Sequence, residues 1–428
     1  MKIRLIRGVS LVELMVALAI GTLLILALVQ VFAASRTAYQ LSSGLARTQE
    51  NGRFAIDILQ RDIRMAGHMG CVNDQSRFLP GNVTTSRPAL ISTFLTADQQ
   101  FGTGAAPVTD YSGAPFALRF DRAIEGYNAK DTASGNTLSL AAVPTLADAG
   151  TNDWEPAINA GLYGLLTAAP GRLVRGSDVL VLRYFTPTGA QVASFTPGAP
   201  TSITVDSTAR LTEGVTSPGL FGIADCMQAG VFRATSVSGN NISVATGGLN
   251  QTTFDTIPQF TIGQAMLYRA ESVVYYVGLN ANDSPALYRL RYTASPGAAT
   301  VGSTKEELVE GIESLQLQYG QDSNTSLAAR PTGNIGQSVL PANLQPSGNA
   351  GGNAASQANY AQAWRRVGMV QVGLVARSPD SAAAEQRSAA PNATRLTAVG
   401  VMVAPPDDRR YRAVYEDTIA LRNRLFGN

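Results

Sequence analysis

The chain has 428 residues, room for two or three average domains, although β-rich domains often run larger. Charged residues make up only 15%, and there are 41 glycines and 21 prolines, which favours a loop-rich extracytoplasmic β protein over a charged cytosolic enzyme. The formal net charge is +2, so the composition gives no support for broad electrostatic binding to nucleic acid, for which a basic footprint is expected.

An apolar stretch dominates the N-terminal end. Three basic residues lie among the first seven, Gly8 follows, and residues 9–34 then form a run of 26 residues with a single charge, Glu13. At about 1.5 Å per residue this run makes a helix of roughly 39 Å, enough to cross a hydrocarbon core of about 30 Å. An unpaired carboxylate in such a span costs on the order of a few kcal/mol, so Glu13 is a candidate functional residue that needs a partner.

The start of the chain resembles the leader of type IV prepilins and type II secretion pseudopilins. The matching residues are a short basic segment ending in Arg7-Gly8, followed by Val9-Ser10-Leu11-Val12-Glu13-Leu14. The resemblance implies that a prepilin peptidase cleaves between Gly8 and Val9 and methylates the new N-terminus at Val9. It also implies that the apolar segment anchors the chain in the lipid bilayer and later joins a filament core, where Glu13 pairs with an N-terminal amine, usually of a neighbouring subunit. Most family members carry Phe where this chain has Val9.

Two other interpretations of the N-terminal stretch stay open. A secretory signal peptide cut after Ala33 would explain the small-residue pattern of Val31-Phe32-Ala33, but the apolar run exceeds the usual 7–15 residues and carries an acid near its start. A plain single-span anchor explains the length and gives no reason for Gly8 or Glu13. Removal of the leader, residues 1–8, would take away three positive side chains and leave a formal charge of about −1.

The helical pattern continues beyond the apolar run. Recurrence at a spacing of three to four predicts an amphipathic helical segment over 35–67. The resemblance implies that this segment and the apolar run form one long helix from about Val9 to Met65. The stripe consists of Leu41, Leu45, Thr48, Gly52, Ala55, Leu59 and Asp62, flanked by Ile58, Ile63 and Ala66. No proline occurs before Pro80, so nothing forces a sharp kink.

The remainder, residues 68–428, is predicted to be a β-rich domain. Strand patterns occur at 179–185, 203–205, 229–237, 242–244, 266–279, 286–292, 315–319, 367–377 and 396–403. A hairpin is expected between 266–279 and 286–292, and 315–319 alternates as if one face were buried. Residues 72–170 are predicted as loops with a few strands, and residues 321–359 lack periodicity, which predicts a flexible, surface-exposed insertion.

Further segments resemble a narrower group, the PilW-like minor pilins. They are residues 50–57, 61–67, 70–71, 176–180, 225–226, 228–232, 308–313, 315, 319–320, 409–412, 418 and 421–424. The resemblance implies a pilin-like α+β fold, in which a long N-terminal membrane-spanning helix packs on a β-rich extracytoplasmic globular domain with large loops. It implies a non-catalytic role in type IV pilus assembly, as part of an initiation or tip complex.

The same resemblance implies partners and a location. The expected partners are other minor and major pilins, the prepilin peptidase, the inner-membrane pilus assembly machinery and the lipid bilayer. The expected location is the inner membrane, with a single pass and the C-terminal domain in the periplasm, and then the pilus. Two alternatives remain: a tip adhesin or DNA-uptake subunit that binds a ligand through 72–170 and 321–360, and a minor pseudopilin of a type II secretion system.

Cys71 and Cys226 are the two cysteines, and in an exported chain they most simply form one disulfide. Such a bond would close a loop of 155 residues, and loop entropy assigns it roughly 4–5 kcal/mol. A metal site at His68 and Cys71 is the alternative, but zinc takes three or four protein ligands and His68 is the single histidine. The sequence does not exclude two free thiols.

No catalytic, metal-binding or cofactor motif occurs in the sequence, so no catalytic residue and no cofactor are predicted. Residues 280–283 and 322–324 carry oxygen ligands that calcium accepts, but turns explain both better. The arginines Arg365, Arg366, Arg409, Arg410 and Arg412 could meet DNA phosphates or acidic patches on partners. A solvated face explains them more simply, and nucleic acid is a weakly supported partner.

Overall fold

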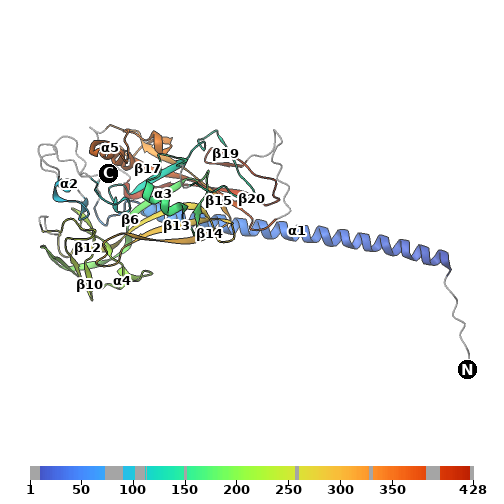
Figure 1. Ribbon diagram of the computed structural model, residues 1–428, viewed down its shortest axis with the longest axis horizontal. Helices are drawn as coiled ribbons and strands as arrows, with labels where there is room; N and C mark the ends of the chain where they lie inside the picture. The colour runs from blue at the N-terminus through green and yellow to red at the C-terminus, as the bar shows by residue number, and fades with distance from the viewer. Residues whose placement is uncertain are drawn as a thin grey trace, which may run out of the picture.

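The computed structural model describes residues 10–72, 90–101, 111, 113–148, 152–255, 260–326, 331–381 and 396–424. A single long helix, α1 (Leu11–Met65), opens this part of the chain. Its first half projects away from a β-rich domain, and its second half lies along that domain (Figure 1). The long N-terminal helix packed on a β-rich domain is therefore confirmed.

The second half of α1 buries the stripe that the spacing predicts. Its buried residues are Gly44, Thr48, Gly52, Ala55, Leu59, Asp62 and Ile63. The prediction is wrong only at its start, because Leu41 is 40% exposed and Leu45 is half-buried. Contact between the helix and the domain begins near Gly44, so Leu41 precedes it and Leu45 lies at its edge.

One large sheet contains thirteen strands within the described residues. Along its main path the order is β1 (Leu90–Ser92), β9 (Ala229–Arg233), β8 (Leu220–Ala224), β12 (Met266–Leu279), β6 (Val179–Thr196), β7 (Thr201–Val205), β11 (Asn241–Val244) and β10 (Ser236–Ser238). Off this path lie β13 (Pro285–Thr293), β14 (Gly302–Glu310), β2 (Ile124–Ala129), β4 (Trp154–Glu155) and β5 (Arg172–Leu173). The expected hairpin is confirmed, since β12 and β13 pair antiparallel from Leu279 opposite Pro285.

A second sheet, which we call the C-terminal sheet, packs against the second half of α1. Its antiparallel strands are, in order, β16 (Ile335–Val339), β15 (Ile312–Asp322), β17 (Val367–Arg377) and β20 (Arg412–Ala420). A small third sheet consists of β18 (Leu396–Ala398), β19 (Val401–Ala404) and β3 (Thr137–Ser139). The short helices are α2 (Ala97–Phe101), α3 (Ala160–Thr167), α4 (Ala209–Thr212) and α5 (Ala354–Arg365).

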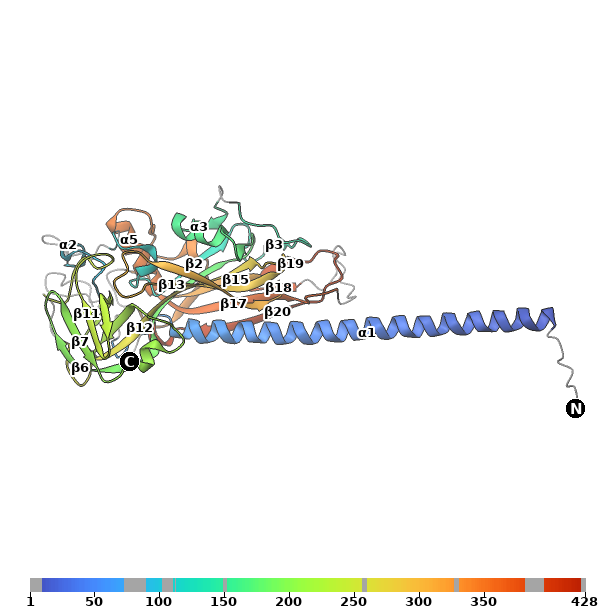
Figure 2. The same ribbon diagram turned by 60° about the horizontal axis from the view of Figure 1, so that its bottom comes forward.

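The apolar core is divided along the length of the molecule. One cluster joins α1, the C-terminal sheet and α5 to the adjoining strands of the large sheet. Another gathers under β7, β8, β9 and β11 around five phenylalanines, Phe195, Phe221, Phe232, Phe254 and Phe260. We call this second region, residues 190–267, the distal lobe. It lies at the end of the molecule farthest from the start of α1 (Figures 1 and 2).

Several local predictions need correction. Residues 321–359 are not without regular structure, because they contain β16, a 3-10 turn (Pro341–Asn343) and the first half of α5. Apolar periodicity did not reveal these elements, because β16 is exposed on both faces and α5 is rich in Ala, Gln and Asn. The pattern predicted one strand at 396–403, whereas the structure has the β18–β19 hairpin there. On β15 both faces are buried from Ile312 to Leu317, so the expected one-sided burial is wrong.

Candidate assembly helix and its attachment

The first half of α1 is an exposed apolar rod. Its large apolar side chains from Leu11 to Phe32 are 52–73% exposed. An 18-residue window of the helix has a mean hydropathy of 2.6 and buries none of its residues. Apolar surface in water costs about 25 cal/mol per Å², and a helix that is apolar all round is typical of a membrane span or of the centre of a helix assembly. The helix is long and apolar enough to cross a membrane.

Glu13 caps the described start of this helix. Its Oε2 accepts a hydrogen bond from the backbone N–H of Ser10 at 3.0 Å. The segment Ser10-Leu11-Val12-Glu13 has the spacing of a capping box. This motif is visible in the sequence, but apolar periodicity does not detect it. The carboxylate is thus directed toward the N-terminal end of the helix. Gly8 and Val9, between which cleavage is predicted, lie outside the described residues.

Asp62 connects α1 to the large sheet. Its side chain is buried, its Oδ2 accepts the hydroxyl of Tyr275, and the same oxygen lies 3.5 Å from Arg289 Nη1. Burial, followed by the charge of Asp62, raises the pKa of Tyr275 well above its usual value. The tyrosine therefore stays a donor, and its hydroxyl and Arg289 supply partners for the buried Asp62 side chain inside the interface.

Hydrogen bonds also fix α1 to the C-terminal sheet and its flanking segments. They join Asn51 Nδ2 to Glu310 O at 3.0 Å, Gln60 Nε2 to Asp417 Oδ2 at 2.8 Å, and Asn423 Nδ2 to Arg64 O at 3.0 Å. Gly52 lies against Tyr415 and Gln60 is bonded to Asp417, so the residue numbers of helix and β20 increase together along their shared contacts. The helix therefore runs in the same direction as β20 (Figure 2).

Gly52 marks the closest approach of helix and sheet. A Cβ atom on this residue would overlap the ring of Tyr415 on β20. We expect Gly52→Ala to lower the free energy of unfolding by about 1–3 kcal/mol, because overpacking outweighs the gain in helix propensity. The measurement is chemical denaturation of the full chain in detergent micelles.

A matched control for Gly52 lies in α3, where a Cβ on the helical residue Gly164 would have nothing within 4 Å. Gly164→Ala should leave stability unchanged or raise it by up to about 1 kcal/mol. Tyr415→Ala should rescue much of the packing loss in the Gly52→Ala background, since the two residues are in contact. Equal stability of Gly52→Ala and the unmodified chain would contradict the close approach.

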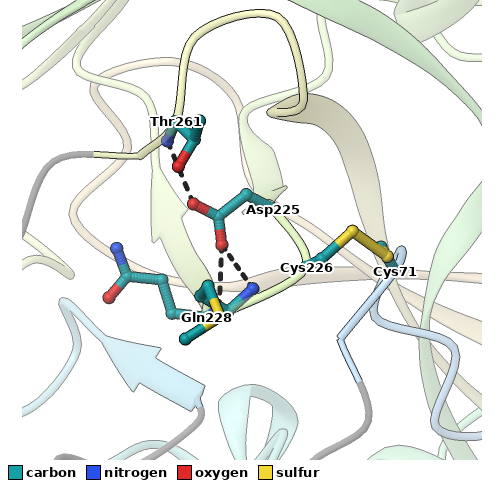
Figure 3. Close-up of a disulfide and its surroundings, with 6 residues drawn as sticks. Cys71, Asp225, Cys226, Gln228 and Thr261 are labelled. Carbon is teal, nitrogen blue, oxygen red and sulfur yellow. Dashed lines mark hydrogen bonds between the residues drawn. A yellow bond between two sulfur atoms is a disulfide. The ribbon is translucent and has the colours of Figure 1, made fainter.

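The end of α1 is tied to the distal lobe by a disulfide. Cys71 and Cys226 are bonded, with 4.7 Å between their Cα atoms, and the partner cysteine lies in the turn between β8 and β9. Figure 3 shows that the neighbouring Asp225 organises this turn: its Oδ1 accepts the backbone N–H groups of Met227 and Gln228 at 2.8 and 2.9 Å, and its Oδ2 that of Thr261 at 3.0 Å. The expected disulfide is present.

His68 has a structural setting between helix and sheet. Its Nδ1 lies 2.9 Å from the carbonyl oxygen of Phe185, and its ring meets Tyr268 edge to face at 5.7 Å. Because Cys71 is in the disulfide, its thiolate is not available to join His68 at a metal. No group of three or more metal-binding side chains occurs among the described residues.

Ser177 and Asp178 fasten β15 to the large sheet. Asp178 is buried and accepts the backbone N–H of Ala129 through Oδ1 and that of Leu317 through Oδ2, each at 2.7 Å. Ser177 Oγ accepts the backbone N–H of Leu315 at 3.0 Å. Burial raises the pKa of Asp178 to about 8, although both backbone hydrogen bonds favour the carboxylate. This pair explains why a polar dipeptide stands before the apolar strand β6.

Glu313 lies between two buried arginines. Its carboxylate accepts Nε and Nη2 of Arg412 at 2.7 and 3.0 Å and Nη1 of Arg377 at 3.1 Å. Arg412 in turn donates to both carboxylate oxygens of Asp408 at 2.7 Å. Burial acts to raise the pKa of Asp408, but the hydrogen bonds and charge of Arg412 lower it. The cluster joins the start of β15, the end of β17 and the start of β20.

The arginines considered for phosphate or partner binding do not form one exposed surface. Arg365, Arg366 and Arg412 are buried. Arg366 Nε donates to the carbonyl oxygen of Asn324 at 3.1 Å, and Arg410 Nη1 donates to that of Ser378 at 2.9 Å. Of the five, only Arg409 is exposed, so the prediction that these arginines form a solvated face is wrong. Arg366, Arg410 and Arg412 instead bridge segments of the C-terminal sheet.

The two segments considered for calcium are turns. Asn280 Oδ1 accepts the backbone N–H groups of Asn282 and Ser284, each at 3.0 Å. Asp322 Oδ1 accepts those of Asn324 and Thr332 at 2.8 and 3.0 Å. The side-chain oxygens are used by backbone donors, as the turn interpretation predicts.

Comparison with known proteins finds that part of the chain matches one family. Residues 274–423 match the family described as Type IV Pilus-assembly protein W. This segment runs from β12 to the 3-10 turn after β20 and leaves out α1 and the distal lobe. A type IV-like pilin from Thermus thermophilus is similar at 14% identity and a TM-score of 0.20, over 56% of this chain and 86% of that chain. No curated protein matches the chain.

Proposed function

We propose that this chain, whose residues 274–423 belong to the PilW family of type IV pilus-assembly proteins, is a non-catalytic minor pilin that takes part in the initiation or tip complex of the fibre. One observation carries the proposal. The same helix that exposes an apolar half buries its other half against strands that come mostly from the segment matched by the PilW family. A subunit of this shape can be held in a membrane and then transferred, helix first, into a bundle of similar helices.

The leader and the first turn of the helix supply the proposed processing site. In this proposal, prepilin peptidase cleaves between Gly8 and Val9, Val9 is methylated, and residues 9–34 span the inner membrane with the domain in the periplasm. Glu13 then pairs with the N-terminal amine of a neighbouring pilin. The direction of the Glu13 carboxylate toward the helix start supports this pairing, and low dielectric strengthens it.

We expect Glu13→Ala to leave membrane insertion intact and to reduce incorporation of the protein into sheared fibres by about tenfold or more, because an N-terminal amine would be left unpaired in an apolar bundle. The measurement is quantitative immunoblotting of membrane and fibre fractions. Glu50→Ala, which removes an exposed carboxylate from the second half of the same helix, is the matched control. Wild-type amounts of Glu13→Ala in fibres would remove this role from Glu13.

The function itself is tested by the intact mass of the protein from cells with and without the prepilin peptidase. A mature chain that starts at methylated Val9, and that disappears without the peptidase, would support the pilin pathway. A chain that starts at Ala34 would make the protein an ordinary exported domain. An uncut chain in both strains would reduce α1 to a simple anchor and would refute the proposal.

A further inference from the structure

A polar pocket of about 370 Å³ lies on the face of the C-terminal sheet that is turned away from α1. Tyr415 and Asp417 face the helix, so the alternating residues Glu416 and Thr418 of β20 face the opposite side. The β18–β19 hairpin closes one side of the pocket and lies against β17 and β20 (Figure 2). The pocket therefore belongs to the surface that α1 leaves open.

The floor of the pocket is a row of polar side chains in register. Gln318 on β15 is opposite Gln371 on β17, and Gln371 is opposite Thr418 on β20. Each strand contributes one side chain at the same level, because cross-strand partners in an antiparallel sheet share a face. The floor is thus built from three strands and does not depend on a loop.

One wall of the pocket is the turn between β18 and β19, and both backbone polar groups of Val399 in this turn are hydrogen-bonded to side chains of the sheet. Val399 donates its backbone N–H to Glu416 Oε1 at 2.5 Å and accepts Gln318 Nε2 at its carbonyl oxygen at 3.1 Å. A Cβ on Gly373 would meet the Val399 side chain, so this glycine lets the turn sit directly on β17. Val399 has a φ of +47°, which is costly for a β-branched residue and persists only where its surroundings fix it.

Several polar groups of the lining have no hydrogen-bond partner among the described residues. They include Glu416 Oε2, Gln318 Oε1, the Gln371 amide and the Thr418 hydroxyl. No lysine, arginine or histidine occurs in the described lining. The lining includes two acidic residues, Glu416 and Asp417, but the Asp417 carboxylate accepts Gln60 on the α1 side of the sheet. On its open face the pocket therefore offers the carboxylate of Glu416 and several neutral acceptors, and it offers no cation to attract a phosphate or carboxylate.

We propose that this pocket binds a primary ammonium group, as carried by a lysine side chain of a partner protein. Val399 already donates to one oxygen of Glu416, so a guanidinium that forms two parallel hydrogen bonds to the carboxylate would have to share that oxygen, whereas an ammonium needs only the other one. An ammonium is a point charge with three donors, which match one carboxylate oxygen, an amide oxygen and a hydroxyl. The site holds too few carboxylates for a divalent metal.

The lysine comes from a protein of different sequence. The chain has three lysines, and Lys2 lies outside the described residues. Lys130 Nζ donates to the carbonyl oxygen of Asn152 at 3.3 Å, and Lys305 Nζ donates to that of Pro170 at 2.8 Å. A second copy of this chain therefore has both described lysines engaged. This inference stands whether or not the protein is a pilin.

The test is binding of a blocked Gly-Lys-Gly peptide to the full chain in detergent micelles, followed by saturation-transfer NMR. We expect saturation at the lysine ε-methylene and roughly fivefold weaker binding to Glu416→Gln, which keeps an oxygen for Val399 but loses the charge. Gln371→Lys should abolish binding, because it places an ammonium in the pocket. Glu50→Gln is the control, and an unchanged melting temperature shows that each variant is folded.

Three results would overturn the proposal. The first is equal binding of the acetyl-lysine peptide, which carries no charge. The second is an unchanged affinity of Glu416→Gln for the lysine peptide. The third is the absence of lysine binding together with binding of glucose, which would make the pocket a site for a neutral polyol.

Discussion

Glu313→Ala should lower the free energy of unfolding by about 3–5 kcal/mol, because removing one partner of a buried ion pair leaves the other charge unpaired. The carboxylate of Glu313 is 1% exposed, and the side chains of Arg412 and Arg377 are 0 and 3% exposed. Without Glu313, Arg377 would lose its carboxylate partner and Arg412 would keep only Asp408. Urea denaturation of the full chain in detergent micelles measures the loss.

A surface pair of the same type is the control for Glu313. Glu306 Oε2 lies 2.7 Å from Arg289 Nη2, but the Glu306 side chain is 59% exposed. Water and salt screen this pair, so Glu306→Ala should cost no more than about 1 kcal/mol. Equal losses of unfolding free energy for the two variants would show that burial does not determine how much the Glu313 cluster stabilises the fold.

Asp178→Ala should cost about 2–4 kcal/mol, because it leaves the backbone N–H groups of Ala129 and Leu317 buried without acceptors. Asp178→Asn should recover only part of the loss, since its amide group has one oxygen and would turn a second donor toward an N–H. Unfolding by urea and hydrogen exchange at Leu317 measure the two effects.

Asp57→Ala is the matched control for Asp178, because Asp57 is an exposed carboxylate on α1. Surface substitutions of this kind usually change stability by less than about 0.5 kcal/mol. A small effect of Asp178→Ala, similar to that of Asp57→Ala, would mean that other groups hold β15 on the large sheet.

The spacing of apolar residues predicted the features that depend on residues close together in the sequence. The stripe from Thr48 to Asp62 repeats every three to four residues, and burial of one helix face follows from that period. The β12–β13 hairpin was predictable for the same reason, because two strand patterns flank a short polar turn. The single pair of cysteines left few ways to form the disulfide.

Contacts between residues far apart in the sequence could not be predicted in this way. Glu313 and Arg412 are 99 residues apart, and nothing in either segment distinguishes a buried arginine from a solvated one. The turn at Val399 interrupts an apolar run, but its first residue is β-branched, which argues against a positive φ. The distal lobe stayed hidden because its phenylalanines come from separate short strands and loops that share a core only after folding.

The parallel course of α1 and β20 determines how the molecule carries tension. A pull on the N-terminal end along the helix axis acts along the line of contacts from Gly52 to Arg64, so these contacts are sheared together and are not peeled one at a time. Beyond them, the Cys71–Cys226 bond joins the end of the helix covalently to the turn between β8 and β9. Load applied at one extremity of the molecule therefore reaches the opposite extremity without relying on non-covalent contacts alone.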